Sequence, residues 1–285
     1  MGDKQPPYFR IFLTFLRNSL IRDMTFRANF LIEAIASLSW MLANLGFYIL
    51  IFSYTRSIGA GTGWGQYEFF VFLSTTLFVN SIVQAFFMPN AEEFSELIRT
   101  GKLDFALLKP IDTQFLVSLE RVNWPSLVNF LAGIILLSYS LWHLTTQAES
   151  PLHLVPTMWV LYPFYVLCGV VILYSLMIAL ASTSIWLGRN QTLYDFWFYI
   201  TNFSRYPMEI YSGPWGLPLR WFFTFLIPVL VVVNVPARIL AQPLRPSSSL
   251  EWWLAPFGLL ATIGSLLASR WLFNRALLSY RSASS

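Results

Sequence analysis

Histidine and cysteine most often carry metal or nucleophilic chemistry, and the 285-residue chain contains two histidines and one cysteine. His143 and His153 lie ten residues apart, which is not a spacing at which two imidazoles usually bind one metal ion. Cys168 lies in an apolar run, so we expect a small buried side chain without a reactive role. Neither His-Glu-x-x-His nor Gly-x-Ser-x-Gly occurs. The sequence therefore predicts no catalytic residues, no metal site and no cofactor bound by this chain.

Two other patterns could do chemistry. Gly59, Gly61, Gly63 and Gly65 resemble a phosphate-binding loop, but no Gly-Lys-Ser/Thr follows them, so nucleotide binding is excluded there. The acidic residues lie mostly at the ends of apolar segments, and no pair of carboxylates within one segment predicts a proton relay. If this protein moves a substrate, we expect the energy to come from elsewhere.

Composition indicates a membrane protein. Hydrophobic residues make up 56% of the chain and charged residues 11%, against about 25% charged in soluble domains. This excludes a soluble globular enzyme and a disordered chain. Six charge-free intervals approach or exceed the roughly 20 apolar residues that a helix needs to cross a bilayer: 34–55, 69–91, 122–148, 150–188, 221–237 and 252–269. We therefore expect an all-α, polytopic membrane protein, in which the net charge of +4 reflects topology and no nucleic acid is bound.

Five of the six predicted spans have a single placement, and the remaining one has two candidate placements. The predicted spans are 30–52, 68–88 ending at Pro89, 115–141 kinked by Pro125, much of 156–187, and 251–273.

The fifth span has two candidates. Hydropathy favours 217–235, but prolines crowd that region, as they do in broken or re-entrant helices. The alternative is 191–211, where Arg205 and Glu209 are spaced to pair on one helix face.

Charge patterning predicts two segments outside the spans. Residues 8–27 combine four arginines with an apolar period of three to four, which is typical of an interfacial amphipathic helix, although a plain topological anchor is the alternative. Residues 90–112 form the most charged internal segment, interrupted at Gly101 and closed by Pro110. Most of the 18 basic residues fall on one side if both termini are cytoplasmic, which is the orientation we expect.

Two stretches carry a family resemblance. Ile98–Asp112, IRTGKLDFALLKPID, is similar to a G-x-L-D-x-x-L-L-x-P segment through Gly101, Leu103, Asp104, Leu107, Leu108 and Pro110. The second stretch comprises Arg205-Tyr206-Pro207, Ile210-Tyr211, Ile227-Pro228 and Val235-Pro236-Ala237, and the Gly63-Trp64 and Tyr67-Glu68 pairs also fit. Together they resemble the ABC-2 family transporter permeases, in the branch whose ATPase is a separate chain.

The resemblance implies a fold and a set of partners. It implies a single transmembrane domain over 1–285 with six transmembrane helices, an interfacial helix at 8–27, a cytoplasmic coupling segment at 90–112 and an outer re-entrant segment at 212–250. It therefore favours 191–211 as the fifth span. It also implies an exporter in the plasma (inner) membrane, with an ABC ATPase subunit that binds ATP and Mg, a second permease and membrane lipids as partners.

The resemblance also suggests which residues act. The expected ATPase-coupling residues are Glu92, Glu93, Glu96, Arg99, Lys102 and Asp104, for which a solvated inner loop is the alternative. Spans two and five should line the translocation path, through Thr76, Asn80, Ser81, Gln84, Trp197 and Phe198. The polar groups among these could equally bond to neighbouring helices. The aromatic content would suit an amphipathic or lipid-like substrate.

Three other functions stay open. A noncatalytic assembly subunit would need no coupling to ATP hydrolysis. An integral membrane lipid-modifying enzyme is less consistent with the missing catalytic constellation, and a secondary transporter with the missing intramembrane acid.

Overall fold

The computed structural model describes residues 7–59, 62–147, 152–187, 191–242 and 249–280, and every regular element in these ranges is helical. The helices are α1 (Tyr8–Thr25), α2 (Arg27–Tyr54), α3 (Gln66–Phe86), α4 (Met88–Arg99), α5 (Leu103–Leu107), α6 (Thr113–Leu119), α7 (Val128–Thr146), α8 (Pro156–Leu187), α9 (Gln191–Asn202), α10 (Gly213–Trp221), α11 (Val229–Ala241) and α12 (Ser249–Ser279). Short 3₁₀ turns lie at Trp124–Leu127, Phe203–Arg205 and Met208–Ile210, and a π-helical turn at Phe222–Leu226.

Five helical segments are long and apolar enough to cross a membrane: Arg27–Tyr54, Gln66–Arg99, Trp124–Thr146, Pro156–Trp186 and Trp253–Ser279. A sixth is reached if the pair Gly213–Leu226 and Val229–Ala241, bent by 88°, forms one span. The chain is thus a multi-pass membrane protein whose described elements are all helical. By length and composition, its described helices reach the predicted six spans if the bent pair counts as one span.

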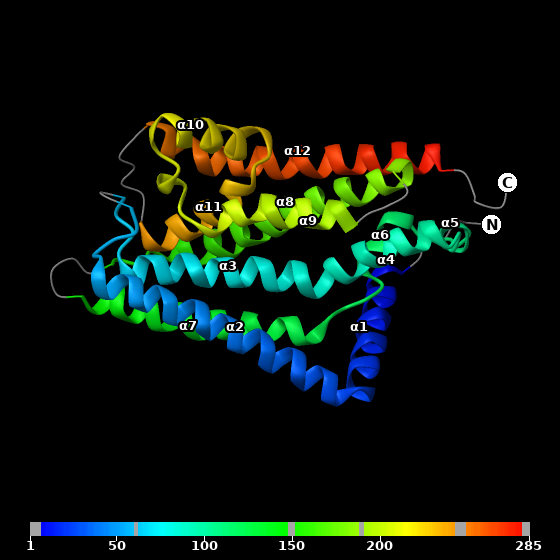
Figure 1. Cartoon of the computed structure of the whole chain (residues 1–285), viewed down its shortest axis with the longest axis horizontal. Coiled ribbons are helices and arrows are strands. Elements are labelled where there is room, and N and C mark those ends of the chain that lie inside the picture. The colour runs from blue at the N-terminus through cyan, green and yellow to red at the C-terminus, as the bar shows by residue number, and fades with distance from the viewer. Residues whose placement is uncertain (1–6, 60–61, 148–151, 188–190, 243–248, 281–285) are drawn as a thin grey trace.

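The long helices lie side by side in a bundle, with α3, α8 and α11 at its centre and α2 at its edge (Figure 1). Most of α11 is buried, from Val229 to Ala241. Gly169 on α8 permits the contact with this helix, because a Cβ at Gly169 would lie 2.6 Å from the carbonyl oxygen of Val232. The centre of the bundle therefore depends on close backbone packing, as is common between membrane helices.

Gly169→Ala is expected to lower the free energy of unfolding by about 1–3 kcal/mol, because the methyl group meets backbone that cannot rotate away. Unfolding of the purified chain by a denaturing detergent would measure it. Gly264→Ala on α12 is the matched control, since a Cβ there meets no atom within 4 Å. Equal stability of the two variants would contradict the prediction.

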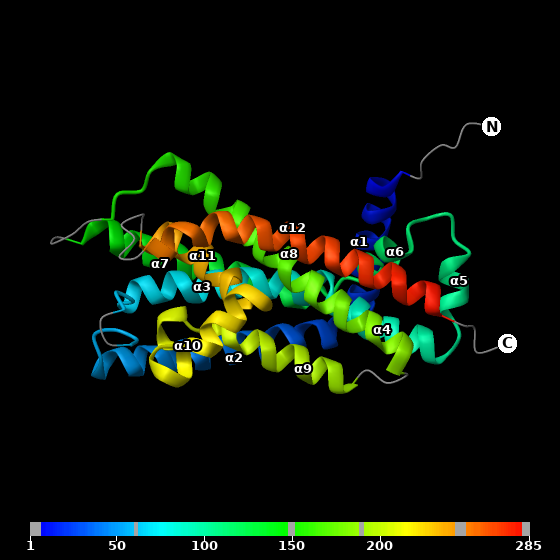
Figure 2. The same cartoon turned by 90° about the horizontal axis from the view of Figure 1, so that it is seen from above.

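The two ends of the bundle differ. One end holds α4, α5 and α6 together with the start of α1 and the last turns of α12, and α5 extends beyond the others (Figures 1 and 2). The Tyr8 hydroxyl accepts from the backbone N–H of Asp112 at 3.3 Å, and Arg270 of α12 binds the carboxylate of Asp112. At the opposite end, Trp64 of the loop after α2 donates to Glu209 at 2.9 Å. The first described residues and the last turns of α12 therefore share one end.

The predicted second span, 68–88, agrees with α3 to within two residues at each end, but the predicted role of Pro89 and the prediction for the third span were wrong. Pro89 does not end a helix. It lies in the first turn of α4, where the backbone N–H that proline lacks would have no intrahelical partner. Helices α3 and α4 are therefore separated by one residue. Residues 115–141 do not form one helix either. Asp112 caps the separate helix α6, and Asn123 caps the turn from which the third span rises. Pro125 lies in that first turn and therefore does not kink the span.

Neither candidate for the fifth span is one continuous helix. The segment 191–211 starts beside the end of α8 and reaches the opposite end of the bundle at Glu209. Only its first part is an α-helix, because α9 ends at Asn202 and short 3₁₀ turns follow. The segment 217–235 is broken at Ile227 and Pro228, because proline at 228 cannot supply the backbone N–H that a continuous helix needs.

The bent pair α10–α11 matches most of the predicted re-entrant segment 212–250, whose residues 243–248 lie outside the described ranges. Its turn at Leu226–Pro228 lines a cavity together with Ile172 and Leu176, which lie about halfway along α8. Both limbs of the pair lie in the same half of the bundle (Figure 1). This geometry is compatible with a re-entrant hairpin, which stays a prediction for the membrane.

The predicted pairing of Arg205 with Glu209 was wrong. Pro207 separates two short turns here, so the two side chains do not share a helix face. Glu209 instead forms an ion pair with Arg238 of α11, and both side chains are only 15% exposed.

Candidate functional site

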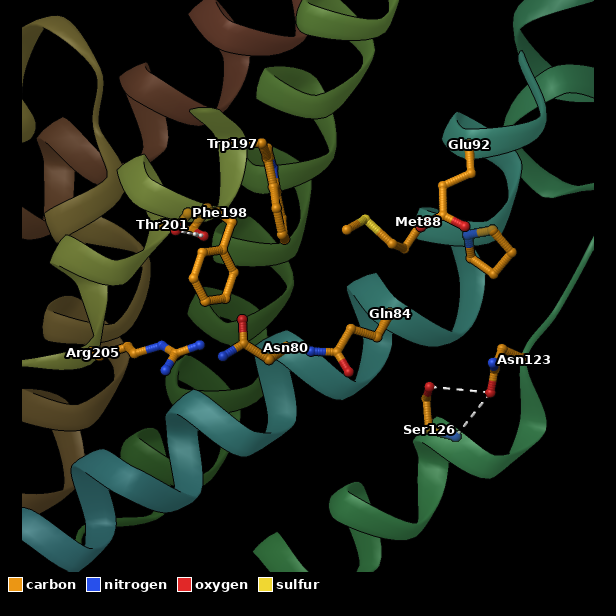
Figure 3. A pocket seen from close by; sticks show the side chains of 11 residues that line it. Asn80, Gln84, Met88, Glu92, Asn123, Ser126, Trp197, Phe198, Thr201 and Arg205 are labelled. Atoms are coloured by element: carbon orange, nitrogen blue, oxygen red, sulfur yellow. Dashed lines mark hydrogen bonds between the residues drawn. The ribbon is translucent and has the colours of Figure 1, made fainter. Parts of the chain in front are cut away.

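A cavity of about 380 Å³ lies between α3–α4, α9 and the turn that precedes α7 (Figure 3). Its lining residues are Asn80, Gln84, Met88, Pro89, Glu92, Asn123, Ser126, Trp197, Phe198, Thr201 and Arg205. Most of these side chains are polar or charged. Polar groups in a membrane-spanning bundle are energetically costly and usually mark a functional site.

Helical periodicity places these side chains. Asn80, Gln84, Met88 and Glu92 recur every four residues along α3 and α4, so they form one stripe on a nearly continuous helix. On α9 and the turn after it, Trp197, Thr201 and Arg205 recur at the same interval. The cavity is the space between these two stripes.

Four of the six predicted path residues line this cavity, namely Asn80, Gln84, Trp197 and Phe198. Thr76 and Ser81 do not: both are buried, and the hydroxyl of Thr76 donates to the carbonyl of Phe72 at 3.0 Å. That bond lies within α3, so it joins Thr76 neither to the cavity nor to a neighbouring helix.

Sequence reasoning missed Met88, Thr201 and Arg205 as lining residues and assigned Glu92 to coupling alone. The interval of four that links Asn80 to Glu92 is a signal in the sequence that could have found Met88 and Glu92.

The charges of the cavity lie at opposite sides (Figure 3). The guanidinium of Arg205 lies 5.4 Å from the ring centroid of Phe198, within the range of a cation–π contact. Glu92 lies across the cavity, beyond Gln84 and Met88. Between the two charges the polar groups are neutral.

The charged segment 90–112 forms a separate packed unit at the end of the bundle. Phe94 of α4 and Leu103 of α5 are buried with Leu116 of α6 against Ile178 of α8 and Phe273 of α12. Gly101 makes the turn between α4 and α5 with a φ of +68°, which residues with a Cβ rarely adopt. We call α4, α5 and α6 the platform. Because its core is shared with α8 and α12, a displacement of the platform must move these helices.

The predicted coupling residues have different surroundings within the platform. Glu93 pairs with Arg121 at 2.9 Å, and Glu96 pairs with Arg99 through two bonds of 2.5 and 2.8 Å. Lys102 is exposed beside the turn, and Asp104 belongs to α5. Glu92 faces the cavity.

Polar contacts fasten α6 to the long helices. Arg270 of α12 donates to the Asp112 carboxylate at 3.0 Å and to the Gln114 side chain at 2.8 Å. Gln114 in turn donates to the Tyr174 hydroxyl of α8 at 3.0 Å, which also bonds to Ser118. The Arg270 guanidinium holds the pKa of the Asp112 carboxyl below its usual range, so the pair stays ionised at neutral pH.

The extended residues 121–123 between α6 and α7 are held from two sides. The Asn90 side chain bonds to both the N–H and the carbonyl of Arg121, at 2.8 and 2.6 Å. Ser19 of α1 accepts from the N–H of Val122 at 3.1 Å, and Asp23 from the N–H of Trp124. Helix α1 is therefore bonded directly to the segment that links the platform to α7.

Residues 38–284 match the family model described as ABC-2 family transporter protein. This chain belongs to the ABC-2 transporter family. Neither the curated proteins nor the solved structures include a match.

The matched range of this ABC-2 protein includes the cavity and the platform and starts within α2. Members of this family are typically non-catalytic permeases. Within the described ranges, no group of three or more histidine, cysteine or acidic side chains could hold a metal ion. The sequence motif from Gly101 to Pro110 forms the outer part of the platform, where Leu103 is fully buried while Phe105 and Leu108 are 70% and 80% exposed.

Proposed function

We propose that this ABC-2 protein is the permease subunit of an ATP-driven exporter, with ATP and Mg bound by a separate ATPase subunit. Two observations together support the proposal: the family match and the presence of the platform. The platform projects from the bundle and shares its hydrophobic core with α8 and α12. A rigid contact of this kind is what a transporter needs in order to receive the motion of an ATPase.

The outer tip of the platform is the proposed ATPase contact. Phe105 and Leu108 are exposed there beside the cations Lys102 and Lys109. Because Leu103 and Ala106 anchor the same helix in the platform core, the tip is held in place. A few exposed apolar side chains on a rigid support, surrounded by charge, are typical of a protein–protein contact. Glu96 instead bonds within the platform, and Glu93 bonds to Arg121 in the segment that follows it, so we assign both to the integrity of this region.

Charge supports an orientation with both termini in the cytoplasm. The end with the platform carries most of the basic residues, among them Arg10, Arg17, Arg22, Lys102 and Lys109. Basic residues concentrate on the cytoplasmic side of membrane proteins. We place the platform in the cytoplasm, α1 in the membrane interface and the chain in the plasma (inner) membrane.

The cavity is the proposed half of a translocation path. Phe198 is 47% exposed and Arg205 is exposed in the isolated chain, so the cavity is open on one side. A second permease, identical or related, would close it. Alternation between inward-open and outward-open states would then follow the two states of the ATPase.

Affinity capture of the full chain from its native membranes, in mild detergent, tests the proposal. We expect a soluble ATPase in stoichiometric amount, and the same data count the permease species. Reproducible capture of folded chain without an ATPase would overturn the proposal and favour the noncatalytic assembly subunit.

A further inference from the structure

The cavity contains a cation without a matching anion. Among the described residues no carboxylate forms an ion pair with Arg205, which contacts the face of Phe198 and interacts electrostatically with the neutral Tyr48 side chain. Other arginines of the bundle differ: Arg238 pairs with Glu209, Arg270 with Asp112, and Arg121 with Glu93. Arg205 is exposed at the open side of the cavity, and a guanidinium without a carboxylate partner on a membrane-spanning bundle is costly, so it points to a ligand that supplies the negative charge.

Glu92 cannot supply that charge. Figure 3 places Arg205 beside Asn80, and Glu92 at the far side of the cavity. Asn80 and Glu92 are three helical turns apart, which corresponds to about 18 Å at 1.5 Å per residue. At that distance Glu92 instead repels an anion from its own side of the cavity, and so favours one orientation of a ligand with a single negative end.

The remaining residues that line the cavity suit a ligand with an apolar body and a polar head. Near Arg205, the amides of Asn80 and Gln84 can donate hydrogen bonds to an anionic group. The rings of Trp197 and Phe198 and the Met88 side chain offer an apolar wall. A volume of about 380 Å³ is within the range of small-molecule sites.

We propose that the cavity binds an amphiphile with an anionic head, a carboxylate or a phosphate, whose head lies at Arg205 and whose apolar body lies on Trp197 and Phe198. This inference rests on the proposed function in one respect: it treats the bound ligand as the substrate that the transporter moves. Binding itself requires this chain alone.

The test uses the full chain in nanodiscs of phosphatidylcholine, with empty nanodiscs subtracted. The probes are tritiated dodecyl phosphate and dodecyltrimethylammonium, which share a tail and differ in the sign of the head. We expect dodecyl phosphate to bind about tenfold more tightly, and Arg205→Gln to abolish that preference. Arg205→Lys should retain most of it, because the charge remains. Arg56→Gln, which removes an exposed arginine outside the cavity, is the matched control.

Equal binding of the two probes by the wild-type chain, which requires no variant to fold, would overturn the inference. So would an unchanged preference in folded Arg205→Gln. Adding phosphatidylglycerol to the nanodiscs distinguishes two sources of the anionic head. If phosphatidylglycerol displaces dodecyl phosphate, the site accepts a lipid headgroup. If it does not, the site accepts a free amphiphile. Because no ATPase is present, a failed capture experiment and a failed binding experiment are distinguishable.

Discussion

Glu209→Gln is expected to lower the free energy of unfolding by about 3–5 kcal/mol, because it removes one charge from an ion pair that is largely buried. Both side chains of this pair are 15% exposed, and Glu209 also accepts from the indole of the fully buried Trp64. The pair therefore joins three segments at one end of the bundle: the loop after α2, the turn at 208–210 and α11. Denaturing-detergent titration of the purified chain would measure the loss.

Two further variants make that prediction specific. Glu96→Gln removes one partner of an exposed pair and is expected to leave stability nearly unchanged. The double variant Glu209→Gln with Arg238→Met removes both charges, and should recover much of the stability lost by Glu209→Gln alone. If the double variant were less stable than Glu209→Gln, the loss of charge balance between Glu209 and Arg238 would not be the cause of the lower stability.

The variant Phe105→Ser/Leu108→Ser is expected to weaken binding of the ATPase subunit at least about tenfold, with stability of the permease nearly unchanged. The reason is that both side chains are exposed in the isolated chain and contribute little to its core, while apolar anchors carry much of the free energy of a protein contact. Titration of the captured ATPase against permease nanodiscs would measure the affinity.

The matched control is Trp215→Ser, which removes an 88% exposed aromatic side chain from α10, in the other half of the bundle. It should leave ATPase binding unchanged. Wild-type affinity in the platform variant would place the ATPase contact elsewhere on the cytoplasmic side. Lower affinity in both variants would indicate a general effect on folding.

Local composition determined the class of this protein. Charge-free runs between 34 and 269 predicted membrane helices, because the cost of moving a segment into hydrocarbon depends mainly on its own residues. The same holds for α1, whose range matches the predicted helix at 8–27, and for the break at Gly101. Hydropathy did not decide the segment 191–241, because its prolines permit several broken paths of similar polarity.

The partner of each charge was decided only by tertiary structure. Arg205 and Glu209 have a spacing that suits a pair, yet Glu209 binds Arg238, 29 residues further along the chain. Likewise Asp112 binds Arg270, and the segment 121–123 binds α1 across about a hundred residues. The cavity too arises only when the stripes of α3–α4 and α9 face each other. The periodicity of the sequence determines which face of a helix a side chain lies on. The packing of the helices determines what that face contacts, and this packing depends on residues that are distant in the sequence.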